Sequence, residues 1–480
     1  MRRPPSTSRI PFGMIMPHMS RSLLSFCVLL SLFSTLGGCG YVRPTLNAPL
    51  TQWEPGGGYR LKNLPANVDN TDSLLIYASF SGGGTRASTL AFGALRELAR
   101  QQITWEGRTK RLLDELDVVN SLSGGTFTGA YYALFGDQIF KDFEYRFLRK
   151  DWESELKARI FKSPGNWIRL WSPYFGRTHI MAELLDEALF DGKTYADLLR
   201  RGQRPYVNIH ATDMATLARF EFTQIQFDWI CSDLTQLPIA RASAASAALP
   251  LVLSPISFRN YAGTCGFTVP TAAVDEAIKR GGTSAQRARE YLSYLDVKKR
   301  SHLHLLDGGL SDNMALRSLL EGASVIGGLE NLLKFSQLKS VKKFVVLAVN
   351  AETNPDVADF GSDQIPTLSK ALSSLIDVPI NRYSSDTLAL IQLGVERVRK
   401  QLRSRPRAPD SLFTEDAEIY FINVSFSEIA DDEERESLMR IPTTLSLTDA
   451  QIDRLLLGAA RLIQRDPEFQ RLMHDIETGK

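Results

Sequence analysis

Cysteine and histidine are scarce in this chain, and so are runs of one charge. Only four cysteines and six histidines occur among 480 residues. Neither C-x-x-C nor H-E-x-x-H is present, so we expect no metal site. The 56 basic and 54 acidic residues give a formal net charge of +2, and no basic run is long enough to form a nucleic-acid-binding face. We therefore expect no nucleic-acid partner.

The apolar stretch at residues 23–33 is too short to span a membrane comfortably as a permanent helix. It follows Arg9 and Arg21 and precedes several small residues. A basic segment, an apolar stretch and small residues in this order are typical of a secretory signal peptide. We assign that signal to residues 1–38.

The end of the signal, L-G-G-C at 36–39, resembles the lipobox of bacterial lipoproteins, in which cleavage before the cysteine exposes a thiol that becomes lipidated. We predict lipidation at Cys39, and an ordinary cleavable signal is the alternative. Because Gly40 rather than Asp follows, the same resemblance implies a lipid-anchored protein of the bacterial cell envelope, at the outer membrane. The start codon stays open, since three methionines precede the apolar stretch: Met14, Met16 and Met19.

Loss of residues 1–38 would remove four arginines and no acid, which leaves 52 basic and 54 acidic residues. With Cys27 removed and Cys39 acylated, Cys231 and Cys265 remain. In an oxidising compartment the two could pair, or they could stay separate thiols. The sequence leaves both open, because it does not give their distance.

Residues 39–70 are rich in Pro, Gly and Asn and predict a flexible tether behind the lipidated cysteine. We expect one catalytic domain over 71–465, with helical insertions near 137–200 and 271–300. Residues 466–480 are expected to be the end of a C-terminal helix or a tail.

From residue 71 on, strand and helix patterns alternate, which favours an α/β fold. The expected architecture is a three-layer α/β/α sandwich with a mostly parallel central sheet. The predicted strands are 74–80, 116–119, 206–212, 220–227, 302–306, 344–349 and 419–424, and the clearest helices are 87–102, 126–135 and a capped amphipathic helix that starts at 448.

Three consecutive glycines follow the first strand, in S-G-G-G-T-R at 81–86. Gly82, Gly84 and Ala87 fit the G-x-G-x-x-A pattern of dinucleotide sites, but the next strand ends without the acid that would bind a ribose. No Gly-Lys-Ser/Thr follows either, so a phosphate loop is unsupported. We therefore expect no cofactor, and interpret the glycines as backbone donors of an oxyanion hole.

The second strand runs into S-L-S-G-G at 121–125, where a helix begins. A serine at a sharp strand-to-helix turn between small residues is typical of a nucleophile elbow, and Ser123 would be the nucleophile. Ser121 stands where the G-x-S-x-G pattern has its first glycine. The alternative is an ordinary helix cap.

A Ser–acid–His triad is disfavoured, because only His474 follows the best acid candidate and it lies at the charged end of the chain. That acid is Asp307, in D-G-G at 307–309 after a strand. Asp-Gly is also a common turn pair. An aspartate can nevertheless activate a serine directly if burial tunes its pKa.

S-G-G-G-T-R, S-x-S-x-G and D-G-G, in this order, resemble the patatin-like phospholipase family, as does A-S-A-A at 242–245 before Leu249-Pro250. The resemblance implies that Ser123 is the nucleophile and Asp307 the base of a Ser–Asp dyad without histidine. It implies an oxyanion loop of Gly82, Gly83 and Gly84, supported by Arg86.

By the same resemblance we expect a serine lipid acyl hydrolase, which cleaves carboxylic ester bonds of phospholipids or related glycerolipids through an acyl-enzyme. Membrane lipids would be both substrate and anchor, and the sequence leaves protein partners open. A lipid acyltransferase and a non-catalytic lipid-binding lipoprotein are the alternatives. The aromatic and basic segment 137–175 is interpreted as a buried helical layer, with a lid or lipid-facing surface for anionic head groups as the alternative.

Overall fold

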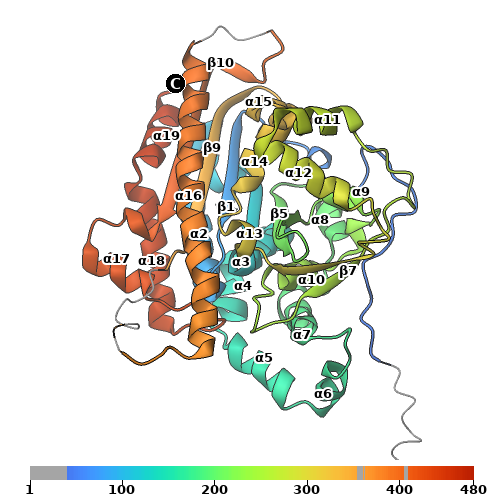
Figure 1. Ribbon diagram of the computed structural model, residues 1–480. Coiled ribbons are helices and arrows are strands. Elements are labelled where there is room, and N and C mark those ends of the chain that lie inside the picture. Colours follow the sequence, from blue (N-terminus) through green and yellow to red (C-terminus); the bar gives the residue numbers. More distant parts are fainter. Residues whose placement is uncertain (1–40, 354–360, 362, 405–408, 480) are drawn as a thin grey trace, which may run out of the picture. The chain divides into compact units, whose positions relative to one another are not determined.

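The computed structural model describes residues 41–353, 361, 363–404 and 409–479 (Figure 1). The predicted signal peptide and Cys39 lie outside these residues. From Arg43 on, the described chain forms one compact unit.

A mixed sheet runs through this unit in the order β10-β9-β1-β4-β5-β8-β7, with β6 paired to β5. Five strands are parallel: β1 (Leu74–Phe80), β4 (Leu116–Leu122), β5 (Tyr206–Asp213), β9 (Val341–Asn350) and β10 (Phe413–Ser425). Three are antiparallel to their neighbours: β6 (Arg219–Glu221), β7 (Ile256–Arg259) and β8 (His302–Asp307). A separate hairpin joins β2 (Gln102–Trp105) to β3 (Arg108–Arg111). The predicted α/β fold with a mostly parallel sheet is confirmed.

Helices cover both faces of the sheet. The helices on one face include α2 (Gly84–Arg100), α3 (Ser123–Phe135), α18 (Asp449–Arg465) and α19 (Pro467–Thr478), and those on the other include α14 (Arg317–Ile326), α15 (Leu329–Phe335) and α16 (Leu368–Ser404). Successive strand side chains enter opposite cores, since a strand alternates its faces. Ile76 and Ala78 belong to the first core and Leu75 to the second.

The remaining helices lie between and around these layers: α4 (Ile139–Phe143), α5 (Trp152–Phe161), α6 (Pro164–Leu170), α7 (Arg177–Leu185), α8 (Tyr195–Arg201), α9 (Gln224–Trp229), α10 (Ile239–Ser246), α11 (Thr271–Arg280), α12 (Gly282–Ser293), α13 (Gly309–Asp312) and α17 (Asp432–Met439). None of the helices in the described ranges is both long and apolar enough to cross a membrane.

The predicted strand 220–227 is wrong for most of its length. β6 ends at Glu221, and Thr223 then caps α9 by accepting the N–H of Gln226. A cap on a short helix therefore overrides the β propensity of the aromatic residues in this segment.

The predicted flexible tether is wrong for Arg43–Asn70, which belong to the compact unit. Asn47 donates to Ser232, and Tyr59 is fully buried against the ring of Tyr206. The chain's end is likewise packed: α19 buries Leu472, and Asp475 accepts a hydrogen bond from Tyr420.

Cys231 and Cys265 form a disulfide, which closes one of the two possibilities that the sequence left open. The bond joins the end of α9 to the loop after β7, and Leu50 and Trp53 of the N-terminal segment donate their backbone N–H groups to these two cysteines.

Candidate active site

Ser123 lies at the sharp turn between β4 and α3, with φ at +46°, in the left-handed region that few non-glycine residues adopt. The small residues after it are needed because the glycine loop passes directly over the start of α3. A Cβ on Gly124 would lie 2.0 Å from the carbonyl oxygen of Gly84, and one on Gly125 would lie 2.6 Å from that of Ser81.

Ser121 lies next to a glycine of the facing helix. Its side chain is buried beneath α3, where a Cβ on Gly129 would stand 3.4 Å from the Ser121 hydroxyl. The clash that an added side chain at Gly129 would meet is with Val119 Cγ1 at 2.8 Å, whereas its distance to Ser121 is an ordinary contact. The fold keeps the turn intact with serine at this position.

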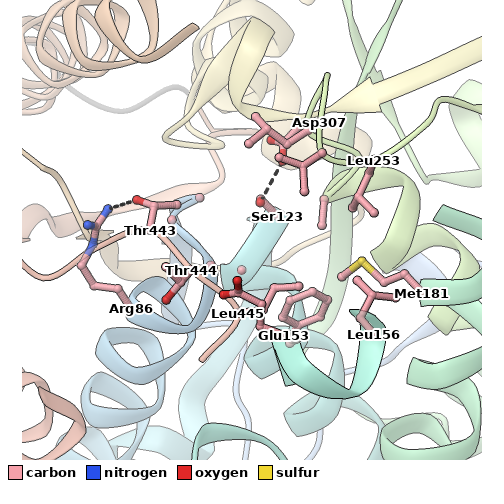
Figure 2. A pocket seen from close by; sticks show the side chains of 18 of the residues that line it. Arg86, Ser123, Glu153, Leu156, Met181, Leu253, Asp307, Thr443, Thr444 and Leu445 are labelled. Carbon is pink, nitrogen blue, oxygen red and sulfur yellow. Dashed lines mark hydrogen bonds between the residues drawn. The ribbon is translucent and has the colours of Figure 1, made fainter. Parts of the chain in front are cut away.

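Asp307 reaches Ser123 from the far side of β5. Although β8 runs antiparallel, it stops opposite Ala211, beside the ends of the parallel strands. The Ser123 hydroxyl donates to Asp307 Oδ2 at 3.0 Å (Figure 2). The N–H of Gly309 donates to Asp307 Oδ1 at 2.8 Å. A Cβ on Gly308 would lie 2.6 Å from the carbonyl oxygen of His210, so the D-G-G turn needs its first glycine.

Burial raises the pKa of Asp307 to about 6, against the opposing effect of the hydrogen bonds from Gly309 and Ser123. A carboxylate with this pKa is ionised at neutral pH and is a stronger base than an exposed one. No histidine is among the described residues that line the cavity at Ser123. His210 is buried in β5 with Nε2 3.1 Å from Asn120, and burial lowers its pKa to about 3.

The three glycines of the loop differ in what their backbone can do. The N–H of Gly82 donates to the carbonyl of Asn313 at 3.3 Å, so it is already used. Gly83 and Gly84 adopt φ values of +133° and +59° and form the cap and first residue of α2. Helix geometry leaves these N–H groups without an intrahelical partner, and neither has a partner among the described residues.

Arg86 is buried and faces away from Ser123 (Figure 2). Its guanidinium donates to the carbonyl of Ala351 at 3.2 Å, to the hydroxyl of Thr443 at 2.9 Å and to the carbonyl of Ile441. The neighbouring N–H of Thr85 donates to the carbonyl of Thr444. Arg86 therefore holds the glycine loop against the segment 441–444, and its support of an oxyanion loop stays a prediction.

Ser246, at the end of α10, is a site residue that the sequence interpretation missed. Its hydroxyl accepts the N–H of Ser123 at 2.8 Å and donates to the carbonyl of His210 at 2.5 Å. The Ala/Ser-rich stretch that contains it was a visible signal. The pattern did not tell Ser246 from Ser243, because the contact joins residues 123 positions apart.

A cavity of about 410 Å³ opens beside the Ser123 hydroxyl. One side is mostly apolar and comes from α3, α5, α7 and the loop after α10, with Phe127, Leu156, Ile160, Met181 and Leu253. Glu153, Lys157 and Arg177 also line the cavity from α5 and α7. The other side is polar and includes Glu352, Thr353, Thr443 and Thr444. In Figure 2 Leu156, Met181 and Leu253 lie on the side of the cavity away from Arg86. The site can therefore hold an apolar chain next to a hydroxyl–carboxylate pair and a loop of backbone donors.

Residues 78–320, just over half of the chain, match the sequence model of the family described as Patatin-like phospholipase. The chain belongs to this family. The match contains Ser123, Asp307 and the glycine loop of the patatin-like site, whereas the segment 441–444 that Arg86 holds lies beyond it.

Solved structures similar to this patatin-like chain include human GIVD cytosolic phospholipase A2, with 13% identity and a TM-score of 0.39 over 85% of this chain and 60% of that one. VipD from Legionella pneumophila is similar with 11% identity and a TM-score of 0.27, over 89% of this chain and 73% of that one. The chain thus spans about 60% of the length of the human enzyme. No curated protein matches it.

Proposed function

We propose that this patatin-like protein is a serine hydrolase that cleaves carboxylic ester bonds of phospholipids or related glycerolipids. The observation that carries the proposal is the 3.0 Å hydrogen bond from Ser123 to Asp307 at the wall of an apolar cavity. Family membership supports a lipid substrate.

In the acylation step, Ser123 Oγ attacks the ester carbonyl carbon while Asp307 Oδ2 takes the hydroxyl proton. The hydrogen bond that exists before the reaction gives the direction of that proton transfer. The tetrahedral intermediate then expels the glyceryl alcohol, which receives the proton back from Asp307. An acyl ester on Ser123 remains.

The negative charge of the intermediate develops on the former carbonyl oxygen. The unpartnered N–H groups of Gly83 and Gly84 at the start of α2 supply donors for it, and the positive end of the helix dipole adds to their effect. Gly82 contributes space rather than a donor, since a Cβ there would stand 3.4 Å from that of Ser123.

In the deacylation step, Asp307 accepts a proton from water, whose oxygen attacks the acyl carbon. Ser123 leaves with that proton returned through Asp307, and a fatty acid is released. The apolar wall formed by Leu156, Met181 and Leu253 is placed to hold the acyl chain through both steps. The polar wall at Thr443 and Thr444 is left for the glycerol side.

The test is a panel of phospholipids, lysophospholipids and triglycerides incubated with the full chain, with product analysis by mass spectrometry. A fluorophosphonate probe identifies the nucleophile by peptide mapping. We expect hydrolysis and labelling at Ser123, and loss of both in Ser123→Ala. Ser121→Ala is the matched control, because it removes a buried hydroxyl two residues away.

Labelling at another residue, or full activity in Ser123→Ala, would refute the proposed nucleophile. Release of acyl esters of an added alcohol in place of fatty acid would replace the hydrolase with an acyltransferase. Absence of turnover on every lipid, with intact folding by circular dichroism, would favour a lipid-binding role.

We also propose that the protein is anchored in the bacterial outer membrane by a lipid on Cys39. The lipobox-like sequence at 36–39 supports this, and so does the disulfide between Cys231 and Cys265, which is typical of oxidising compartments. Labelling of cells with radioactive palmitate tests the anchor. Label should be lost in Cys39→Ser and kept in Cys27→Ser, and label that persists without Cys39 would contradict the anchor.

A further inference from the structure

Six large apolar side chains stand exposed next to the mouth of the cavity. We refer to them as the aromatic patch: Phe161, Trp167, Ile168, Trp171, Leu251 and Val252. Trp171 is 86% exposed and Ile168 is 73% exposed, so folding leaves most of both apolar side chains in contact with water. Exposure of these apolar side chains to water costs free energy, which indicates that the patch serves a function.

The patch is continuous with the cavity. Phe161 and Val252 both line it, and Ile160 and Phe161 also line a shallow hollow that Trp167 and Trp171 complete. Arg177 donates to the carbonyl of Leu251, which ties the loop after α10 to the segment that follows α6. An apolar molecule that leaves the cavity would therefore meet this surface first.

The local sequence builds the patch as a rigid projection. Ser163 caps α6 by accepting the N–H of Asn166, whose amide donates to the carbonyl of Arg159 on α5. Trp167 and Trp171 lie four positions apart, on one face of α6 and its C-terminal cap. Figure 1 shows α5 and α6 at the rim of the compact unit, away from the sheet.

Charge does not account for the surface. Lys157 pairs with Glu153, Arg159 with Glu187 and Arg169 with Glu183. Arg146, Arg149 and Lys150 are paired with acids as well. Over 137–177, the described residues offer no acidic partner to Lys141, Lys162 and Arg177, and Arg177 is used by the carbonyl of Leu251. The anionic-head-group surface considered from the sequence is therefore largely neutralised, and what remains is tryptophan and aliphatic surface. Tryptophan favours the boundary between lipid head groups and acyl chains.

The start of the described chain lies at the same place. The guanidinium of Arg43 stacks 4.1 Å from the centre of the Tyr174 ring and donates to its hydroxyl at 3.0 Å. Cys39, the proposed lipidation site, precedes Arg43 by four residues, and four extended residues reach at most about 14 Å. The chain therefore allows a lipid on Cys39 no farther than this reach from Arg43, whose partner Tyr174 lies three residues after Trp171.

We propose that the aromatic patch docks on the surface of a phospholipid bilayer and presents the cavity mouth to it. Trp171 and Ile168 enter the boundary of head groups and acyl chains, and the docking is apolar rather than electrostatic. The choice of a lipid surface rests on the proposed function, whereas the docking itself is measurable without turnover.

The experiment uses the full chain with phosphatidylcholine vesicles whose acyl chains carry bromine, which quenches nearby tryptophan. The emission of Trp171 is obtained by subtracting the tryptophan emission of Trp171→Phe from that of the wild type. We expect its emission to fall about twofold or more on brominated compared with plain vesicles, and to fall equally in high salt. A lipid on Cys39 would hold either variant on the vesicle, so the quenching is used to measure the depth of Trp171 in the bilayer and not the amount of bound protein.

Trp171→Ala/Ile168→Ala should lower hydrolysis of vesicle phospholipid about tenfold or more, with hydrolysis of a soluble short-chain ester unchanged. Leu390→Ala/Leu393→Ala, on the exposed face of α16, is the matched control and should change neither rate. If turnover is absent but Trp171 is quenched, the docking stands and the proposed function fails.

Unquenched Trp171 with Ser123-dependent hydrolysis would overturn the docking and keep the function. Quenching that high salt abolishes would overturn the apolar mode. A dimer in analytical ultracentrifugation that Trp171→Ala/Ile168→Ala dissociates would show that the patch joins two copies of this chain instead.

Discussion

The hydroxyl of Ser246 accepts the backbone N–H of Ser123 at 2.8 Å while it donates to the carbonyl of His210. This pair of hydrogen bonds ties the elbow, whose Ser123 has a φ of +46°, to the neighbouring strand and to α10. Ser246 is therefore a positioning residue, which acts through the backbone of Ser123.

Ser246→Ala should lower kcat about 10- to 100-fold. The backbone N–H of Ser123 loses its acceptor, and the Ser123 hydroxyl is then no longer held in a fixed direction. KM should stay nearly constant, since the apolar wall of the cavity is unchanged. Ser243→Ala is the matched control: Ser243 is buried in the same helix, and its hydroxyl has no partner among the described residues. An equal loss in both variants would point to damaged packing of α10 instead.

The pH dependence of the reaction should follow Asp307, whose pKa burial raises to about 6. The base must be ionised to accept the proton of Ser123, so kcat/KM should be constant above this pH and should fall about tenfold per unit below it. Initial rates on a soluble ester between pH 4 and pH 9 measure this, at roughly unit intervals.

Asp312 is the control for that profile. Burial also raises its pKa to about 6, but its carboxylate accepts the N–H groups of Met314 and Arg317 rather than the hydroxyl of Ser123. Asp312→Asn should keep the acidic limb near pH 6, roughly where the pKa of Asp307 lies. A limb that disappears with Asp312 would mean that Asp307 is not the titrating base.

Asp307→Asn should stabilise the protein at neutral pH while it abolishes turnover. The folded pKa of about 6 exceeds the ordinary value of 3.8, so the ionised carboxylate destabilises the native state above pH 6 by up to about 3 kcal/mol. The stability of the wild type falls as pH rises from about 4 to about 6, and the gain of the variant should vanish below about pH 4. Thermal unfolding of the wild type and the variant, at about pH 4 and at about pH 8, measures this gain in stability. A variant that is less stable than the wild type at about pH 8 would contradict the cost of burying the ionised carboxylate.

Gly82→Ala tests the space in the loop without touching a donor. Its added Cβ would lie 2.6 Å from Asn313 Oδ1 and 3.4 Å from Ser123 Cβ, so the loop or Asn313 must move. A shift of about an ångström at the reacting atoms can cost about 100-fold in kcat. Gly165→Ala, whose Cβ meets nothing within 4 Å, should leave the rate on a soluble ester unchanged.

Much of the central sheet was predictable because its parallel strands are buried on both faces and read as apolar runs. Leu74–Phe80 is such a run, and its predicted limits agree with β1. The edge was harder: β7 has only four residues and is partly exposed, so no apolar run marks it. The hairpin of β2 and β3 did have a signal in the sequence, which is the glycine at position 107. Its turn places both Glu106 and Gly107 at positive φ, a conformation that favours glycine.

The site was predictable where its parts follow strands and contain glycine. Ser123, Asp307 and the glycine loop each carry such a local mark. The Ala/Ser-rich stretch around Ser246 does not single out this serine, and Thr444 carries no mark at all. The contacts of both residues join segments that only the folded sheet and its helices bring together. The hydrogen bond from the N–H of Gly82 to the carbonyl of Asn313 could not be predicted for the same reason.

Ser121 gives the last test, of whether its hydroxyl serves the elbow or only fills space. It is fully buried, its oxygen has no partner among the described residues, and it faces Gly129 rather than the cavity. Removal of an unsatisfied buried hydroxyl should stabilise by about 1 kcal/mol, so Ser121→Ala should raise the melting temperature and keep kcat. Ser121→Val should do neither, because its added methyl groups meet α3 at Gly129. A loss of activity in Ser121→Ala would mean that the hydroxyl is part of the elbow's hydrogen bonding, and that glycine and serine are not interchangeable there.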